Sequence, residues 1–188
     1  LVMAGANSGA GLRSMPVRYL MLDEIDAYPQ ELDAEGDPVA LAEARTTTFA
    51  RRKVFLISTP TTEALSRIAR EYEESDQRRY HVPCPHCQTE QVLVWEHMTW
   101  TRGQPASARY ACEHCGALLD EAHKTAMLSA GRWVPTHPER EVAGYHINAL
   151  YTPVGLGWSW SDLVVDHEAG ERDPVKAKAF INLRLAQV

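Results

Sequence analysis

The sequence predicts an α/β protein whose first part contains a parallel sheet and whose later part contains a small β module built around four cysteines. Two short apolar runs, 17–22 and 54–57, are separated by a helical pattern, and this strand–helix–strand order is typical of a parallel sheet. From residue 80 onward the pattern changes to short alternating segments around two Cys-x-x-Cys pairs. A chain of 188 residues is long enough for one domain and a small module.

Composition is that of an ordinary globular protein, with 45% hydrophobic and 23% charged residues. The apolar runs are far shorter than the roughly 20 residues that cross a bilayer, so we predict no membrane span. A formal net charge of −6 argues against a tight phosphate-backbone binder, because such proteins cluster Lys and Arg. The chain starts at Leu1 without a Met, a basic segment or a long apolar stretch, so we interpret this N-terminus as neither a natural start nor a signal peptide, and the chain as part of a longer protein.

The first part is predicted to run from a turn-rich loop at 5–14 into a strand at 17–22 that is buried on both faces. Asp37 and Pro38 are typical of a helix start, the first as a cap and the second in the first turn. A second buried strand is predicted at 54–57, and apolar residues at helical spacing then predict a helix across about 62–75.

The second part is predicted to begin with short strands in the cysteine-containing segment. The other elements predicted there are a helix at 122–131, a strand at 144–151, a helix from Ser159 and a last helix capped by Asp173 with Pro174. We therefore divide the chain into 1–78, 79–120 and 121–188. The middle segment is the small β module and the last one connects it to whatever follows.

The strongest single motif is the pair Cys84 and Cys87 followed by the pair Cys112 and Cys115. Two residues between the thiols let one turn direct both sulfurs at a common ion, and two such turns complete a tetrahedral zinc site. A redox dithiol or free thiols would not explain why two pairs occur in a module too small for a good core. The sequence therefore predicts a structural zinc ribbon.

The residue after each cysteine pair differs. Gly116 follows the second pair and can supply a positive φ angle, whereas Gln88 follows the first. Three histidines lie nearby, but four thiolates already complete the zinc coordination. We therefore do not predict histidine ligands.

The run before Asp23 and Glu24 is apolar and ends at these two adjacent carboxylates. Ligands of open α/β sheets bind at the carboxyl ends of the strands. One acid there can hold Mg²⁺, directly or through its water, while a second orients and deprotonates an attacking water. Asp23 suits the first role and Glu24 the second. The alternative is a strand that simply ends at a solvated turn.

The second predicted strand ends at Ser58, Thr59 and Pro60. If the two strands are neighbours, these hydroxyls lie at the same end of the sheet as Asp23 and Glu24, where they can hydrogen-bond a γ-phosphate or the attacking water. The alternative is a turn that caps the following helix.

These motifs, in their order, resemble the large subunit of tailed-phage terminases of the phage lambda type, the ATP-driven motors that package DNA. The resemblance extends over nearly the whole chain and no single motif decides it. It rests on Ala-Asn-Ser at 6–8, Leu-Arg-Ser at 12–14, Leu-Asp-Glu-Ile-Asp at 22–26, Glu-Gly-Asp-Pro at 35–38, Ser-Thr-Pro-Thr at 58–61, Ser-Asp-Gln-Arg-Arg-Tyr at 75–80, the first cysteine pair, and Ala-Gly-Tyr-His-Ile-Asn at 143–148.

The resemblance implies a partial P-loop sheet of the RecA-like, additional-strand type, with the zinc ribbon inserted or appended. It implies ATP, Mg²⁺ and Zn²⁺ as cofactors. Asp23 matches the Mg²⁺-associated Walker B acid and Glu24 the catalytic base. Ser58 matches a cofactor-binding residue and Thr59 a catalytic one, in the motif that couples hydrolysis to DNA movement.

The resemblance also implies a phosphate-binding loop upstream and an endonuclease domain downstream. The glycine-rich run 5–11 has no Lys after its glycines, so it cannot neutralise the β- and γ-phosphates as a Walker A loop does. We therefore expect the chain by itself to hydrolyse ATP negligibly.

The partners implied are double-stranded phage DNA, a terminase small subunit, the portal of the prohead and further copies of the same chain, in the cytoplasm of a bacterial host. Two alternatives stay open. One is a nucleic-acid-dependent P-loop ATPase of helicase type with a zinc ribbon. The other is a zinc-ribbon interaction module without catalysis.

Two further residues have open roles. Arg13 precedes the acidic strand and is a candidate for binding the phosphates of a nucleotide, or DNA, although a solvated loop arginine is the plainer alternative. Asp26 can either support the acidic pair or cap the turn that follows it.

Overall fold

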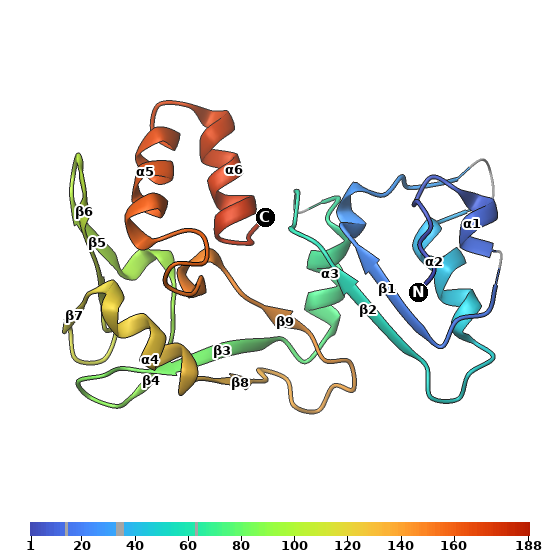
Figure 1. Ribbon diagram of the computed structural model, residues 1–188, viewed down its shortest axis with the longest axis horizontal. Helices are drawn as coiled ribbons and strands as arrows, with labels where there is room; N and C mark the ends of the chain where they lie inside the picture. Colours follow the sequence, from blue (N-terminus) through green and yellow to red (C-terminus); the bar gives the residue numbers. More distant parts are fainter. Residues whose placement is uncertain (14, 33–35, 63) are drawn as a thin grey trace. The chain divides into compact units, whose positions relative to one another are not determined.

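The computed structural model describes residues 1–13, 15–32, 36–62 and 64–188. Ser14 and Glu35, which belong to segments that carry the resemblance, lie outside the described residues. The chain divides into two compact units, Leu1–Ile68 and Ala69–Val188 (Figure 1). No described helix is both long enough and apolar enough to span a bilayer.

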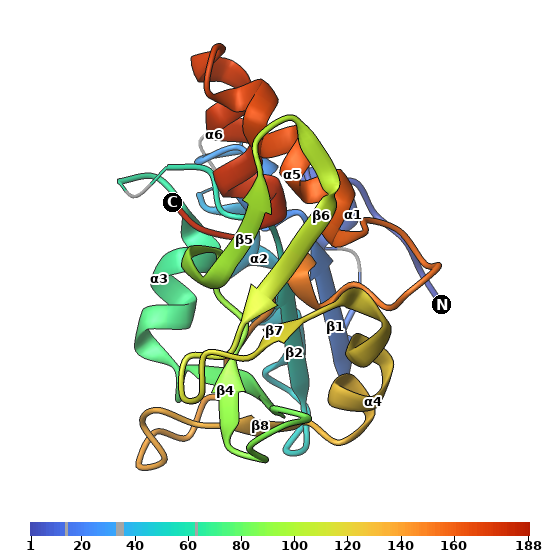
Figure 2. The ribbon, with the colours of Figure 1, turned by 90° about the vertical axis from the view of Figure 1, so that its left-hand side faces the viewer.

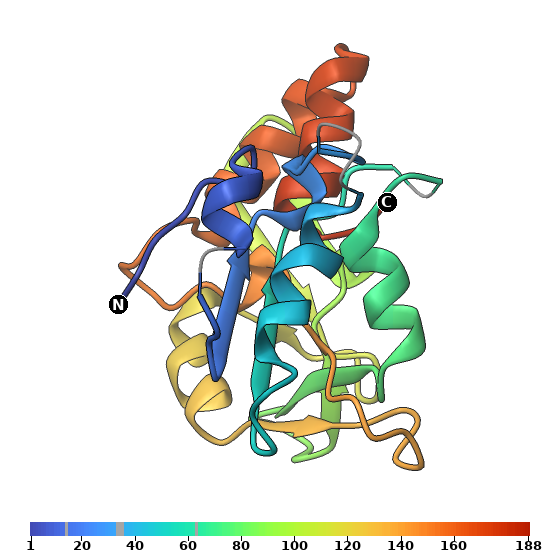
Figure 3. The same cartoon turned by 90° about the vertical axis from the view of Figure 1, so that its right-hand side faces the viewer.

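The first unit is built on two parallel strands, as the strand–helix–strand pattern predicts. Its elements are α1 (Gly9–Arg13), β1 (Tyr19–Asp23), the 3₁₀ turn η1 (Ile25–Ala27), α2 (Pro38–Glu43), the 3₁₀ turn η2 (Ala44–Thr46) and β2 (Lys53–Ile57). The register pairs Tyr19 with Lys53 and Asp23 with Ile57, so both strands end together. Figure 3 shows α1 and α2 in front of this pair of strands.

The core of the first unit lies between the strands and α2. Leu22, Ile25, Val39 and Ala42 are buried together, and Leu56 packs against them. The predicted cap of α2 is confirmed, because the side chain of Asp37 accepts a hydrogen bond from the Val39 N–H and Pro38 starts the helix. The helix covers one face of the two strands and thereby holds their carboxyl ends in place.

The opposite face of the strands differs from the prediction. Tyr19 and Met21 are 64% and 69% exposed, and Phe55 of β2 is 50% exposed. The expectation that β1 is buried on both faces is therefore wrong. Side chains alternate between the two faces of a strand, and only Leu20 and Leu22 of β1 contact the core.

Two other boundaries in this part also differ. The predicted loop at 5–14 contains the short helix α1, which Ser8 begins by accepting a hydrogen bond from the Gly11 N–H. The predicted helix across about 62–75 is shorter: α3 spans Arg67–Glu74. Because α3 passes the boundary after Ile68, it begins in the first unit and ends in the second.

The second unit contains two small sheets, one mixed and one antiparallel, together with several helices. In one sheet β3 (Arg78–Pro83) lies between β4 (Glu90–Val92) and β8 (Arg132–Val134), and β9 (Tyr145–His146) pairs parallel with β3. The other sheet has the order β5 (Met98–Thr101), β6 (Gln104–Ala111), β7 (Leu118–Leu119). The remaining elements are η3 (Trp95–His97), η4 (Glu121–His123), α4 (Lys124–Ser129), η5 (Ala149–Tyr151), α5 (Trp160–Gly170) and α6 (Pro174–Arg184).

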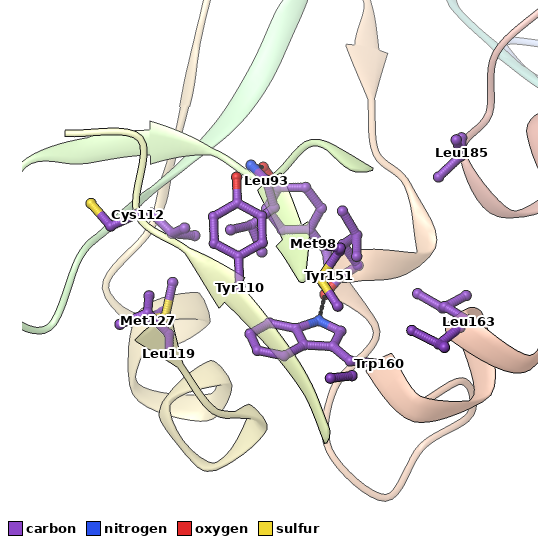
Figure 4. Close-up of a cluster of buried hydrophobic side chains, with 14 of the residues drawn as sticks. Leu93, Met98, Tyr110, Cys112, Leu119, Met127, Tyr151, Trp160, Leu163 and Leu185 are labelled. Atoms are coloured by element: carbon purple, nitrogen blue, oxygen red, sulfur yellow. Dashed lines mark hydrogen bonds between the residues drawn. The ribbon is translucent and has the colours of Figure 1, made fainter. Parts of the chain in front are cut away.

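One hydrophobic core joins the sheets and helices of this unit. Tyr110 from β6, Met127 from α4 and Trp160 from α5 are all buried in it (Figure 4). Trp160 is only 1% exposed, and its indole N–H donates to the Leu150 carbonyl at 3.1 Å. Figure 2 shows the β5–β6 hairpin next to α5, with which β6 is in contact. Residues 79–120 and 121–188 thus share a core.

Local signals predicted some boundaries of this unit well and others poorly. The last helix begins as predicted, because Asp173 accepts from the Val175 N–H and Pro174 is its first residue. Ser159 starts α5 with a reciprocal capping box to Asp162. In contrast, the predicted strand at 144–151 is only β9 followed by the 3₁₀ turn η5.

Candidate acidic site and metal centre

Strand β1 brings Asp23 to its carboxyl end, and Glu24 follows in the turn before η1. Both residues are exposed. Strand β2 ends at Ile57, directly opposite Asp23 in the register, so Ser58 and Thr59 continue from the same end of the sheet. The structure therefore brings the two predicted motifs to one place.

Ser58 makes the connection between these two motifs. Its hydroxyl accepts a hydrogen bond from the Asp26 N–H at 3.2 Å and donates to the Thr59 carbonyl at 3.1 Å. The acidic turn and the segment after β2 are therefore joined directly. Asp26 contributes to this junction, and its side chain reaches the segment after β2 as well: Oδ2 accepts from the Thr61 N–H at 3.0 Å.

The backbone of Glu24 is strained. Its φ of 55° and ψ of 46° lie in the left-handed region, which a side chain with a Cβ enters at a cost of about 1–2 kcal/mol. Strain of this kind is concentrated at functional sites, where the surrounding structure holds it in place. The conformation sets the direction in which the Glu24 side chain leaves the end of β1.

Comparing Glu24→Gly with Glu24→Ala isolates this strain, because both changes remove the carboxylate. We expect Glu24→Gly to have a free energy of unfolding about 0.5–1 kcal/mol higher than Glu24→Ala, since glycine adopts a positive φ freely but loses more chain entropy on folding. Urea denaturation of the two variants measures the difference. Equal stabilities would mean that the turn relaxes to another conformation when the carboxylate is absent.

Tyr28 is a neighbour of the acidic site that the sequence did not reveal. Burial of its phenol raises its pKa, the negative charge of Asp23 raises it further, and a hydrogen bond with the Asp23 backbone partly opposes both. Tyr28 follows η1, and nothing in a tyrosine after a turn indicates this contact. The phenol is thus a polar group beside the first carboxylate.

Arg13 is the last residue of α1 rather than part of a loop. Its side chain is exposed, and its Nε donates to the Gly9 carbonyl at 3.2 Å, one turn earlier in the same helix. A role of Arg13 in binding phosphate stays a prediction.

The four cysteines form the second candidate site. Cys84 and Cys87 lie between β3 and β4, and Cys112 and Cys115 lie between β6 and β7. All four sulfurs are within 4.8 Å of one another. The distances from Cys84 Sγ to Cys115 Sγ and from Cys87 Sγ to Cys112 Sγ are 3.9 Å and 3.8 Å. A tetrahedron with Zn–S bonds of about 2.3 Å has S–S edges of about 3.8 Å, so the cluster fits zinc.

The two cysteine turns share one backbone hydrogen bond and a positive φ angle at the residue after the second cysteine. The Gln88 N–H donates to the Cys84 carbonyl and the Gly116 N–H to the Cys112 carbonyl, each at 2.9 Å. Gly116 has the predicted positive φ of 70°, and Gln88 adopts a φ of 64° despite its side chain. The first turn therefore uses a strained conformation that a glycine adopts without cost.

Replacing Gln88 by Gly is expected to raise the free energy of unfolding by about 0.5–1 kcal/mol, because the left-handed strain disappears and only part of the gain is lost to chain entropy. The reverse change, Gly116→Gln, should lower stability in the second turn. Denaturation curves with metal present measure both. A destabilised Gln88→Gly variant would contradict this account.

The thiol pKa values of the cluster shift in different directions, and that of Cys115 is raised to about 11. Hydrogen bonds with Thr89 lower the pKa of the Cys87 thiol to about 6, whereas burial raises the pKa of Cys84. Metals bind the deprotonated thiolate form. In the part of the chain that the structure describes, these four cysteines are the group of metal-binding side chains that could hold an ion.

Comparisons with known proteins bear on both sites. Residues 1–133 match the family model described as the phage terminase large subunit gpA, ATPase domain. The chain is 26% identical over 210 residues to the terminase large subunit of Enterobacteria phage P21 and 26% identical over 207 residues to that of Escherichia phage lambda. Each alignment covers 97% of this chain and 32% of the relative, so the chain spans about a third of their length. No solved structure matches significantly.

Proposed function

This chain belongs to the ATPase-domain family of phage terminase large subunits, and from that premise we propose that it is part of an ATP-hydrolysing motor that moves phage DNA into the prohead. The family match covers β1, β2 and all four cysteines. In the whole protein we propose an endonuclease in addition. Its partners would be double-stranded DNA, a small subunit, the portal and further copies of itself in the bacterial cytoplasm.

The observation that carries this proposal is the junction at the ends of the parallel strands. Asp23 ends β1 and Glu24 follows it, and Ser58 after the end of β2 accepts a hydrogen bond from the Asp26 N–H of the acidic turn. In this assignment Asp23 would hold Mg²⁺ and Glu24 would take the proton of the attacking water. Ser58 and Thr59 would contact the γ-phosphate or that water. ATP would supply the γ-phosphate that water attacks, and Mg²⁺ would neutralise the negative charge of the phosphates.

The zinc ribbon has a structural part in this proposal. Zinc held by Cys84, Cys87, Cys112 and Cys115 would fix the β3–β4 and β6–β7 turns relative to each other, at the edge of the core of the second unit. We propose that residues 1–78 serve the ATPase, 79–120 the ribbon and 121–188 the connection toward the nuclease.

The test of the function uses the full-length protein. We expect ATP hydrolysis that is stimulated by DNA, and DNA packaging into proheads that stops when ATP is omitted. The purified chain 1–188 should hydrolyse ATP negligibly, because it contains no Gly-rich loop ending in Lys and Ser or Thr. Robust turnover by the 1–188 chain would contradict the proposal that the phosphates are held by residues outside it.

A further inference from the structure

Asp26 lies two residues after Glu24, and its hydrogen bonds cross from the acidic turn to the segment after β2. Its N–H donates to Ser58 Oγ at 3.2 Å. Its carboxylate accepts from the Thr61 N–H at 3.0 Å, from the Thr61 hydroxyl at 3.1 Å and from the Ile68 N–H at 2.9 Å. These partners are 32 to 42 residues away along the chain. Asp26 is thus hydrogen-bonded to three residues after β2: Ser58, Thr61 and Ile68.

The chemistry of these contacts requires a carboxylate. Oδ2 takes both bonds from Thr61, and Oδ1 takes the bond from Ile68. An ionised carboxylate only accepts, and every partner of the side chain here is a donor. An asparagine would direct its NH₂ group at one of these donors and lose at least one bond.

The contact with Ile68 connects the acidic turn to α3. Ile68 is in the first turn of this helix, where backbone N–H groups have no partner within the helix and negative charge is favourable. The Ile68 side chain packs against the core that contains Leu22 and Ile25, close in sequence to the carboxylates. The start of α3 is therefore held by both a hydrogen bond and apolar contacts.

The end of α3 is held separately, inside the second unit. Asp76, two residues after the helix, is buried and accepts from the Gly144 N–H at 3.0 Å and from Arg78 Nε at 2.7 Å. Arg140 Nη1 donates to the Ser75 carbonyl at 2.8 Å. The first turn of α3 is thus bonded within the first unit, and the residues just after its end are bonded within the second.

We propose that Asp26 is a positioning residue that couples ATP hydrolysis to DNA movement, by tying the acidic turn to Thr61 and to the first turn of α3. This inference rests on the proposed function. A change at Ser58 or Glu24 during hydrolysis would be passed through Asp26 to Thr61 and to the first turn of α3. Asp26 does not itself touch the reacting atoms in this scheme.

The test compares Asp26→Asn with wild type in the full-length protein, together with its small subunit, proheads and DNA. The quantity measured is the number of base pairs packaged per ATP hydrolysed, with KM for ATP determined in the same preparation. We expect the base pairs packaged per ATP to fall about fivefold or more and KM for ATP to stay within about twofold. Thr61→Val, which removes one of the three side-chain bonds, should act in the same direction with a smaller effect.

Asp173→Asn is the matched control, because the Asp173 carboxylate also accepts hydrogen bonds from backbone N–H groups in the first turn of a helix, but as the local N-cap of α6 and far from the acidic site in sequence. It should leave the packaging ratio unchanged. Wild-type packaging ratios in both Asp26→Asn and Thr61→Val would overturn the proposal. If Asp26→Asn fails to fold, Thr61→Val alone decides. Glu24→Gln, measured in parallel, separates failure of the proposed function from failure of the Asp26 proposal. Hydrolysis that persists in Glu24→Gln contradicts the proposed function. Unchanged packaging ratios in Asp26→Asn and Thr61→Val contradict only the role of Asp26.

Discussion

Replacing Glu24 by Gln should lower the rate of ATP hydrolysis by the full-length protein by about 10²–10⁴-fold, the usual contribution of a general base. The amide keeps the size of the side chain but cannot accept the proton of the attacking water. The strained turn should remain, because the left-handed backbone of Glu24 is compatible with Gln to the same extent. Nucleotide binding should therefore be retained. Steady-state hydrolysis and equilibrium binding of a labelled nucleotide measure the two effects separately.

Glu31→Gln is the control for this experiment. Glu31 is an exposed glutamate of the same unit, so the change has the same chemistry and charge but lies outside the acidic site. We expect wild-type hydrolysis from it. If Glu24→Gln bound nucleotide and hydrolysed it at the wild-type rate, Glu24 would not be the catalytic base. The same result would favour the alternative in which Asp23 and Glu24 have no catalytic role.

The second large effect is expected from the cysteines. Cys84→Ser and Cys115→Ser should each reduce the zinc content of the purified chain from about one per molecule to nearly none. Each should also lower the free energy of unfolding by at least about 3 kcal/mol, because structural zinc contributes its binding energy directly to folding. Metal analysis and denaturation curves measure both. Chelation of zinc from the wild-type chain should give a similar loss of stability.

The choice of these two cysteines separates metal binding from packing. Cys84 is buried and Cys115 is exposed. If the thiols served only the hydrophobic core, Cys84→Ser would be destabilising and Cys115→Ser close to neutral. If they hold one ion, the two variants should behave alike in spite of their different exposure. A stable Cys115→Ser variant that retains its zinc would contradict the four-thiolate site.

Features that depend on residues close together in the sequence were predictable. Each Cys-x-x-Cys turn was predictable, because two intervening residues direct both sulfurs of a pair to one side. The cysteine types and spacing predicted a four-sulfur cluster, and the structure forms it by bringing together two turns that are 25 residues apart from Cys87 to Cys112. The caps at Asp37 and Asp173 were also correct, since a cap bonds to backbone groups two or three residues away. The parallel pairing of β1 and β2 followed from the order of strand, helix and strand.

Features that depend on contacts between distant residues were decided by the tertiary structure. The bonds from Asp26 to Thr61 and Ile68 join residues 35 and 42 positions apart. Short-range patterns contain no information on such pairs, and so the sequence left Asp26 with two open roles. The exposure of Met21 was also unpredictable, because apolarity of a strand does not say what covers each of its faces. In this protein the sequence by itself determined which side chains are candidates for hydrolysis and for metal binding. Only the tertiary structure decided which residues hold the acidic turn to the segment after β2, because that depends on distant chain segments meeting in space.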